Sequence, residues 1–407
     1  MDLPIGFESI DDPDRSSQCV LKLRANLYGL KQGSHNWYKK LRQGLLDREF
    51  KSSDIDQCLY LKDGMIVLTY VDDCIIVGNS MKEIDEFIES MKNGPENFIL
   101  TDEGDINTFL GIEIKHRNDE VFEMSQPHLI DRILSFLQLE HNGHDTSTKE
   151  RITPAASKVL NKALEGKPRK KTWKYRTAVG MLSYLQANTR PDVSMATHQT
   201  ARFSNNPMLC HEQAVTRIGR YLRHSRDRGI IYRPDKSKGL ECFVDADFAG
   251  GWDNLEPDDA DNVMSRTGFV IKYANCPIFW ASKLQTEIAL STAEAEYIAL
   301  STALREVIPL MTLMEEIHEV FPLHIDKPKF ICKVWEDNQS CISMAKSQKF
   351  SPRTKHIALK YHHFRRHVET GKVQISYVHT EEQEADIFTK PVRDDLFPRL
   401  RFMLMGW

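Results

Sequence analysis

The pattern of apolar and polar residues predicts a hairpin in the first part of the chain. Two apolar, β-rich runs within residues 65–77 lie on either side of Asp72 and Asp73, and a Gly-Asn pair follows them. This pattern is typical of two paired strands with the acidic residues at the tip. Turns favour Asp, so an ordinary hairpin turn accounts for the pair. A metal site accounts for it equally well, because adjacent carboxylates repel each other and Mg²⁺ prefers oxygen ligands.

A helix is expected directly after the hairpin, over residues 80–93. Ser80 and Glu83 have the spacing of a capping box, and apolar residues recur behind them at helical spacing. Strands are expected next over residues 109–114 and 121–124, and then a helix over residues 126–137. The following polar segment, residues 140–171, is broken by Gly and Pro and ends in a basic cluster. We interpret it as a linker whose basic residues either remain solvated or contact phosphates.

The second half of the chain has mainly helical patterns first and strand patterns afterwards. Helices are expected over residues 173–221, from Thr292, after Asp337 and near Glu382, and strands over residues 242–248, 268–273, 278–281, 330–336 and 373–378. A length of 407 residues is enough for two or three domains. The chain is therefore expected to be a multi-domain protein with α+β and α/β architecture.

Four acidic residues of this second half lie at marked positions in the predicted elements. Asp245 belongs to the first strand, Glu294 begins a helix, Asp337 ends a strand and Asp386 lies near the last helix. Each alone has an ordinary explanation, since acids favour helix starts and strand ends. Asp247 shares a face with Asp245, because residues two apart in a strand point the same way. An assisting role and a structural hydrogen bond are equally consistent with its position.

Composition and charge narrow the class of protein. The formal net charge of −4 and the pI near 6.4 do not favour a nonspecific nucleic-acid coat protein. The eight cysteines include no Cys-x-x-Cys pair, which favours a reducing compartment over a disulfide framework or a zinc ribbon. No stretch approaches the roughly 20 apolar residues of a membrane span, and the first residues lack the pattern of a secretory signal. We therefore expect an intracellular location and no membrane partner.

Several motifs together resemble the reverse transcriptase of copia-type retrotransposon Pol polyproteins. The tip Tyr70-Val71-Asp72-Asp73 is similar to the signature hairpin of reverse transcriptases. The segments around it that resemble the family are Cys19–Leu23, Leu27–Gln32 with Trp37 and Tyr38, and Phe109–Glu113. The resemblance implies that Asp72 and Asp73 are catalytic metal ligands of a polymerase palm that binds template–primer nucleic acid.

The same resemblance implies a third metal-binding Asp, on a strand upstream of a Pro-x-Gly-Phe segment. Here that segment, Pro4–Phe7, begins at the fourth residue, which leaves no room for the strand or for the fingers, and Asp2 lies too close to it to be a substitute. Because two-metal catalysis depends on its carboxylate ligands, we expect little or no DNA synthesis by this polypeptide alone. The alternative is a fragment of a longer, active RNA-directed DNA polymerase.

The later motifs resemble the RNase H domain of the same family. They are Val244–Gly250, Arg266–Gly268, Trp280–Lys283, Ser291–Tyr297, Asp337–Ser340, Arg353–Ile357 and Ala385–Lys390, preceded by Tyr175–Leu185, Thr189–Asp192 and Arg202–Phe203 in a connecting region. The resemblance implies that Asp245, Glu294, Asp337 and Asp386 are catalytic and hold two Mg²⁺ ions, with Mn²⁺ as an alternative. Glu296 is set aside, because residues two apart on a helix do not face each other.

The activity implied by this resemblance is hydrolysis of the RNA strand of an RNA–DNA hybrid. One ion activates a water and the other stabilises the leaving 3′ oxygen. Such an enzyme recognises the hybrid by its shape and by phosphate and 2′-hydroxyl contacts. His379 loosely matches a histidine that helps the product to leave, and a plain surface histidine is the other interpretation. The alternative to a nuclease is a nonenzymatic remnant that binds nucleic acid.

The densest basic segment of the chain precedes the last predicted strand. The residues expected to contact the hybrid backbone are Arg353, Lys355, His356 and Lys360. A solvated helix is the other interpretation of this segment. His363 and His367 have the i, i+4 spacing of a zinc pair, but no Cys or acid completes a zinc site at motif spacing.

The predicted organisation follows the order of these motifs. It comprises a truncated reverse transcriptase with an incomplete palm (residues 1–139), a linker (140–171), a helical connection (172–238), an RNase H-like mixed sheet with helices (239–392) and a C-terminal tail (393–407). The expected partners are an RNA–DNA hybrid, template–primer nucleic acid and the rest of the Pol polyprotein. The resemblance implies cytoplasmic virus-like particles, and the nucleus is an alternative location.

Overall fold

The computed structural model describes residues 27, 29–118, 120–140, 151–163, 165–252, 260–321, 330–347 and 359–407. The chain divides into two compact units, Met1–Glu103 with Glu316–Leu323 and Gly104–Glu315 with His324–Trp407. The division at residue 103 lies inside the segment predicted as the first domain, and the boundary at residue 139 stays a prediction. The motifs Pro4–Phe7 and Cys19–Leu23 lie outside the described residues.

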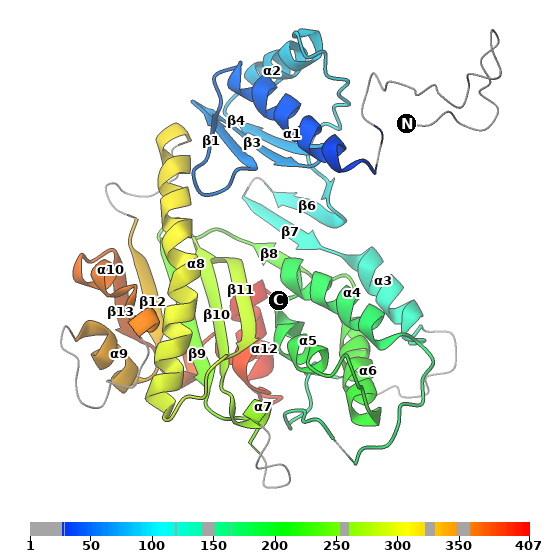
Figure 1. Ribbon diagram of the computed structural model, residues 1–407, viewed down its shortest axis with the longest axis vertical. Coiled ribbons are helices and arrows are strands. Elements are labelled where there is room, and N and C mark those ends of the chain that lie inside the picture. Colours follow the sequence, from blue (N-terminus) through cyan, green and yellow to red (C-terminus); the bar gives the residue numbers. More distant parts are fainter. Residues whose placement is uncertain are drawn as a thin grey trace, which may run out of the picture. The chain divides into compact units, whose positions relative to one another are not determined.

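The first unit contains a four-stranded antiparallel sheet and two helices (Figure 1). Its elements are α1 (Lys31–Leu46), β1 (Lys51–Ser52), β2 (Leu59–Lys62), β3 (Met65–Tyr70), β4 (Asp73–Gly78) and α2 (Met81–Asn93), with the strands in the order β1-β2-β3-β4. The helices and the sheet share one apolar core, which includes Leu45, Tyr60, Val67, Met91 and Phe98. The antiparallel sheet with helices predicted for this part of the chain is therefore present.

The predicted acidic hairpin is confirmed. Tyr70 pairs with Asp73 across a tight turn, in which Val71 has a φ of 53°. Trp37 on α1 donates a hydrogen bond from Nε1 to the Val71 carbonyl over 2.7 Å, which holds the turn against the helix. Asp72 and Asp73 are both exposed at the tip.

The predicted helix after the hairpin is confirmed as α2, but its capping box is not. Ser80 is the N-cap residue, and its side chain makes no capping hydrogen bond to the described residues. The helix is stabilised by its apolar face instead. Met91 is buried, and the centre of the Phe87 ring lies 5.1 Å from that of Phe50. Burial of this face thus outweighs a missing cap, which contributes about 1 kcal/mol in other helices.

The second unit contains two sheets, and the first of them joins residues far apart in the sequence. Its strands are β5 (Thr108–Phe109), β6 (Ile112–Asn118), β7 (Val121–Ser125) and β8 (Ile230–Tyr232), all antiparallel and in that order. β8 pairs with β7, where the rings of Phe122 and Tyr232 stack 4.7 Å apart. The strand predicted over residues 109–114 is divided into β5 and β6, because Leu110 and Gly111 take positive φ values and turn the chain.

The helices predicted after β7 are confirmed. They are α3 (Pro127–Phe136), α4 (Tyr175–Asn188), the short 3-10 helix η2 (Pro191–Val193), α5 (Ser194–Ala201) and α6 (Leu209–His224). A fully buried ion pair lies among them: Arg190 Nη2 is 2.8 Å from Asp192 Oδ2, to which Tyr221 also donates a hydrogen bond. Part of the predicted linker contacts these helices. The Thr153 carbonyl accepts a hydrogen bond from Arg217 Nε on α6 over 3.2 Å.

The second sheet of this unit is the predicted mixed sheet. Its strands are β9 (Leu240–Asp247), β10 (Arg266–Tyr273), β11 (Cys276–Leu284), β12 (Cys332–Glu336) and β13 (Val373–Tyr377), in the order β11-β10-β9-β12-β13. The first three strands in this order are antiparallel, and β12 runs parallel to both β9 and β13. Val244, Ile271 and Val334 in its central strands are fully buried, as expected of a sheet covered on both faces.

The helices of the last part of the chain are α7 (Ala260–Val263), α8 (Thr292–Val320), α9 (Gln339–Lys346), η4 (Leu359–His362), α10 (Arg365–Glu369), η5 (Thr380–Glu382), α11 (Asp386–Thr389) and α12 (Phe397–Met405). Residues 393–407, predicted as a tail, include α12, which buries Leu400 and Leu404. The prediction that no stretch approaches a membrane span is wrong for α8 by length and composition, since an 18-residue window has a mean hydropathy of 1.3. That window is 56% buried, as in the core helix of a globular domain.

Candidate metal centre

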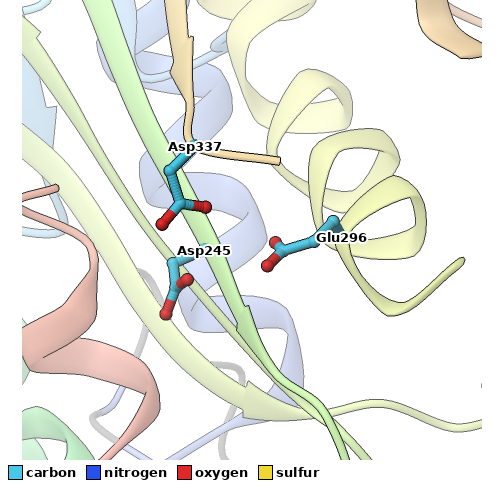
Figure 2. Close-up of side chains that lie close together, drawn as sticks. All are labelled: Asp245, Glu296 and Asp337. Carbon is cyan, nitrogen blue, oxygen red and sulfur yellow. The ribbon is translucent and has the colours of Figure 1, made fainter. Parts of the chain in front are cut away.

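Three acidic side chains from separate elements meet in the second unit. Asp245, Glu296 and Asp337 each offer one carboxylate oxygen, and these atoms all lie within 4.8 Å of one another (Figure 2). Asp245 is 2% exposed and Glu296 is 6% exposed, whereas Asp337 is half-buried. We call these residues the three-acid group. In the part of the chain that the structure describes, no other set of three His, Cys, Asp or Glu side chains is as close.

The mixed sheet brings two of these acids level with each other. β12 runs parallel to β9, and Trp335 pairs with Phe243. Two residues further on stand Asp245, within β9, and Asp337, directly after β12, so they are neighbours across strands that lie about 4.8 Å apart. Glu296 comes from the start of the second turn of α8 and points toward both aspartates (Figure 2).

A fourth acid, Asp386, lies beside the three-acid group. It begins α11, and Thr389 at the end of this helix donates a hydrogen bond from Oγ1 to Asp245 Oδ2. α11 can approach the sheet closely because residue 268 is glycine: a Cβ there would stand 2.6 Å from Thr389 Cγ2 and 2.7 Å from Phe388 Cβ. Gly268 is the β10 partner of Asp245. The close contact between α11 and the sheet therefore lies directly beside Asp245.

Two further side chains contact the acids directly. Lys390 Nζ lies 2.8 Å from Asp386 Oδ1 and 3.9 Å from Asp245 Oδ2. Thr380 donates a hydrogen bond from Oγ1 to Asp337 Oδ2 over 3.0 Å. Neither Lys390 nor Thr380 was singled out from the sequence, although Lys390 belongs to one of its motifs.

Burial and mutual repulsion weaken these carboxyls as acids. Burial, together with repulsion from Asp245, raises the pKa of Asp386 to about 8. Burial and repulsion from the neighbouring Glu336 raise the pKa of Glu296 well above its usual range. The pKa of Asp337 is raised by burial and then by Asp245. A divalent cation among the carboxylates would reverse this repulsion and favour their charged forms.

The donor set fits a hard divalent cation. The three-acid group consists of carboxylates alone, which are the ligands that Mg²⁺ and Mn²⁺ prefer, whereas structural zinc sites use Cys and His. Glu296 Oε2 is buried and has no hydrogen-bond partner among the described residues. A buried carboxylate oxygen without a donor is costly unless a cation uses it. Asp386, beside the group, could hold a second cation together with Asp245.

The three-acid group does not include Glu294, which was predicted as a metal ligand. Its Oε2 accepts a hydrogen bond from the Leu290 amide over 2.8 Å, and its own amide donates to Ser291 Oγ over 3.2 Å. Glu294 therefore caps the start of α8, and Glu296 is the glutamate that lies with Asp245 and Asp337. Glu294 and Glu296 face different ways, as expected of residues two apart on a helix. Glu296 is the one that faces Asp245 and Asp337. The spacing of Ser291 and Glu294 is that of a capping box, which was a signal for the capping role.

The other predicted ligands fall into two places. Asp245, Asp337 and Asp386 come together as expected, and their catalytic role stays a prediction. Asp72 and Asp73 lie in the first unit, exposed at the hairpin tip, and no third acid joins them among the described residues.

The predicted nucleic-acid contacts are described only in part. Arg353, Lys355 and His356 lie outside the described residues. Lys360 is described: it is exposed and forms an ion pair with Glu287, which partly neutralises its charge.

Three residues with open interpretations have ordinary surroundings. Asp247 lies outside the three-acid group, and its pKa is raised by burial and by Asp245. His363 Nδ1 lies 3.5 Å from Ser301 Oγ, and this histidine belongs to no set of three possible metal ligands within the described ranges. His379 is exposed, and its Nδ1 accepts a hydrogen bond from a neighbouring amide over 3.3 Å.

Comparison with known proteins gives matches along nearly the whole chain. Residues 1–150 match the family model described as reverse transcriptase (RNA-dependent DNA polymerase). The chain is 32% identical over 401 residues to the retrovirus-related Pol polyprotein from transposon RE1 of Arabidopsis thaliana, covering 98% of this chain and 25% of that protein. It is 31% identical over 410 residues to the corresponding polyprotein from transposon TNT 1-94 of Nicotiana tabacum, covering 99% of this chain and 29% of that protein.

The chain thus spans about a quarter of the length of the curated relatives that it matches. Among solved structures, the N-terminal RNase H domain of a Mycobacterium tuberculosis protein, fused to maltose-binding protein, aligns with 40% of this chain and 96% of that chain. The identity is 12% and the TM-score is 0.26, so this likeness carries no weight beside the sequence matches. On those sequence matches, the chain belongs to the copia-type retrotransposon Pol family, with its reverse transcriptase region in residues 1–150.

Proposed function

We propose that the second unit hydrolyses the RNA strand of RNA–DNA hybrids with Mg²⁺, as the RNase H part of a copia-type Pol polyprotein. The observation that carries this proposal is the approach of Asp245, Glu296 and Asp337 within 4.8 Å. Carboxylates buried this close repel one another unless a cation lies among them. Oxygen ligands select hard ions such as Mg²⁺, and Mn²⁺ is expected to replace it.

The residues around the centre have distinct parts in this proposal. The three-acid group and Asp386 hold the ions, which when bound would activate a water and neutralise charge on the phosphate. Thr389 orients Asp245 through its hydroxyl, and Thr380 orients Asp337 in the same way. Such outer hydrogen bonds fix a ligand in the position that the ion requires.

The substrate follows from the rest of the chain. Residues 1–150 match the reverse transcriptase family, and DNA synthesis on an RNA template leaves an RNA–DNA hybrid. A nuclease in the same polypeptide is well placed to remove the RNA strand. Recognition of the hybrid is expected to depend on its shape and on phosphate and 2′-hydroxyl contacts, because a sequence-specific nuclease would not clear a whole template.

The direct test is cleavage of a labelled RNA strand by the full chain, by Asp337→Asn and by Asp395→Asn. Asp395 is an exposed acid of the same unit, so it controls for the loss of one negative charge. We expect the parent and Asp395→Asn to cut the hybrid only with Mg²⁺ or Mn²⁺ and to leave free RNA intact. Asp337→Asn is expected to be inactive. No cleavage by a parent that circular dichroism shows to be folded would leave a nonenzymatic remnant that binds nucleic acid.

We also infer that the described residues alone do not complete a polymerase site. Asp72 and Asp73 are exposed, and no third acid lies with them in the described part of the chain. Two-metal phosphoryl transfer depends on carboxylates that hold both ions. We therefore expect no primer extension by this chain alone. A Mg²⁺-dependent extension that is lost in Asp72→Asn would overturn this inference.

A further inference from the structure

Lys390 stands among the acids at a position where a cation is needed. Its Nζ lies 2.8 Å from Asp386 Oδ1 and 3.9 Å from Asp245 Oδ2, and its side chain is 38% exposed. The side chains of both partner acids are only 3% exposed. Asp245 therefore belongs both to the three-acid group and to the pair of acids that Lys390 neutralises.

We propose that Lys390 is a displaceable internal counter-ion, whose ammonium competes with a divalent cation for Asp386 and Asp245. A first ion then binds to the three-acid group without displacing this ammonium. A second ion that uses Asp386 binds only when Lys390 leaves. This inference rests on the proposed metal-dependent function, and it adds an order of metal binding and the residue that controls it.

The chemistry of lysine suits such a role. Its ammonium is a compact charge on a flexible four-carbon stem, so it can leave the two acids without a change in the backbone. The exposure of the side chain gives the ammonium a path into water. The two acids, by contrast, are fixed: Asp245 lies within β9 and accepts the Thr389 hydroxyl, and Asp386 begins α11. A mobile cation on fixed acids is what a competing metal ion would displace.

A permanent ion pair that only stabilises the fold is the competing explanation. The two roles predict different metal affinities. If Lys390 competes with the second ion, removal of its charge strengthens the binding of that ion. If Lys390 is a permanent structural partner, removal of its charge leaves the affinity unchanged or weakens it, because the acids lose the partner that positions them.

The first test is a titration of the full chain with Mn²⁺ in the absence of nucleic acid, in which electron paramagnetic resonance measures the free ion. The parent is expected to bind one ion more tightly than a second. Lys390→Met is expected to lower the second dissociation constant by about tenfold or more, because the ammonium no longer competes for Asp386 and Asp245. Lys390→Arg keeps the charge and is expected to stay close to the parent. A second dissociation constant that is unchanged or raised in Lys390→Met would overturn the proposal.

A second measurement needs no substitution and therefore holds even if Lys390→Met does not fold. The parent is treated with formaldehyde and a reductant, with and without Mg²⁺, and methylation of each lysine is read by mass spectrometry. Methylation of Lys390 is expected to rise as the second ion binds, while that of the exposed Lys82 stays constant. Methylation of Lys390 that does not rise at saturating Mg²⁺ would overturn the proposal.

This proposal and the proposed nuclease function fail on different results. A folded parent that releases Lys390 on metal binding but cuts no hybrid would refute the nuclease alone. A parent that cuts the hybrid while Lys390→Met binds the second ion no more tightly would refute the counter-ion alone. A folded parent that binds no Mn²⁺ would overturn both.

Discussion

The Glu294 carboxylate accepts a hydrogen bond from the Leu290 amide over 2.8 Å and so closes the start of α8. Helix starts leave amides unpaired, and the helix dipole favours a negative charge there. Glu296 is turned by roughly 200° about the helix axis relative to Glu294, and it lies with Asp245 and Asp337. The two glutamates of this helix start therefore have separate surroundings, one at the helix cap and one in the candidate metal centre.

Substitutions of these two residues are expected to affect stability and Mn²⁺ binding differently. Glu294→Ala removes the cap and should lower the free energy of unfolding by about 1 kcal/mol, with Mn²⁺ affinity unchanged. Glu296→Gln removes a crowded buried carboxyl, so it should not destabilise the metal-free protein, but it should weaken Mn²⁺ binding. Urea unfolding in EDTA and Mn²⁺ titration measure both quantities. Weaker Mn²⁺ binding by Glu294→Ala, with Glu296→Gln unaffected, would reverse the assignment.

Replacement of Gly268 by alanine tests whether close packing of α11 builds the centre. The added Cβ would lie 2.6 Å from Thr389 Cγ2 and 2.7 Å from Phe388 Cβ, so the helix has to shift. We expect a loss of about 1–3 kcal/mol in unfolding free energy, together with weaker Mn²⁺ binding. Gly239→Ala is the matched control, because nothing lies within 4 Å of the added atom. Equal effects of the two variants would show that the contact at Gly268 is unimportant.

The raised pKa of Asp386 predicts how stability changes with pH. The pKa rises from 3.8 to about 8 on folding, so the folded chain keeps a proton that the unfolded chain releases between these values. This contribution to stability is complete below about pH 4 and is lost as the pH rises through about 8. In EDTA, Asp386→Asn should therefore make the unfolding free energy less dependent on pH between about 5 and 9. A steeper decline in the variant than in the parent would contradict this.

The affinity for Mg²⁺ should change in the opposite direction over the same range of pH. A carboxylate must lose its proton before it can bind a cation, so metal affinity should rise as the pH approaches about 8. Isothermal titration of the parent at several pH values measures this dependence. An affinity that does not change with pH would mean that the carboxyls are already charged at the lowest pH.

The buried ion pair in the connecting helices predicts a large effect on the free energy of unfolding. Asp192→Asn leaves the fully buried Arg190 guanidinium without a counter-charge, which should cost about 3–5 kcal/mol. Tyr221→Phe removes the hydrogen bond to the same carboxylate and the one that Arg401 donates to the hydroxyl, and it should cost about 1–2 kcal/mol. Urea unfolding of the two variants gives the comparison. A similar cost for both would show that the charge of Asp192 contributes little.

Local patterns predicted most of the strands and helices because these elements bury one regular face. The hairpin that ends in Tyr70 and Asp73 and the central strand β9 are of this kind. The prediction failed where a turn interrupts an apolar run. Leu110 and Gly111 take positive φ values there and turn the chain. It also failed for α12, because the burial of Leu400 depends on the rest of the core and not on its neighbours in sequence.

The candidate centre was predictable only as far as strand geometry determines it. Asp245 and Asp337 end up adjacent because parallel strands bring equivalent positions together. The choice between Glu294 and Glu296 depends on the phase of one helix, which the spacing of the acids alone does not determine. The position of Lys390 depends on how a four-residue helix packs on Gly268, and this contact between distant parts of the chain leaves no local pattern.

The assignment of the second unit as a metal-dependent nuclease is tested most directly by hybrid cleavage with Glu296→Gln and Glu294→Gln. With Mg²⁺, the parent should cut the RNA strand, and Glu294→Gln should cut it at a rate close to that of the parent. Glu296→Gln should be slower by at least roughly a hundredfold, because it loses a direct metal ligand. No cleavage by a folded parent, or a Glu296→Gln variant as active as the parent, would contradict the assignment.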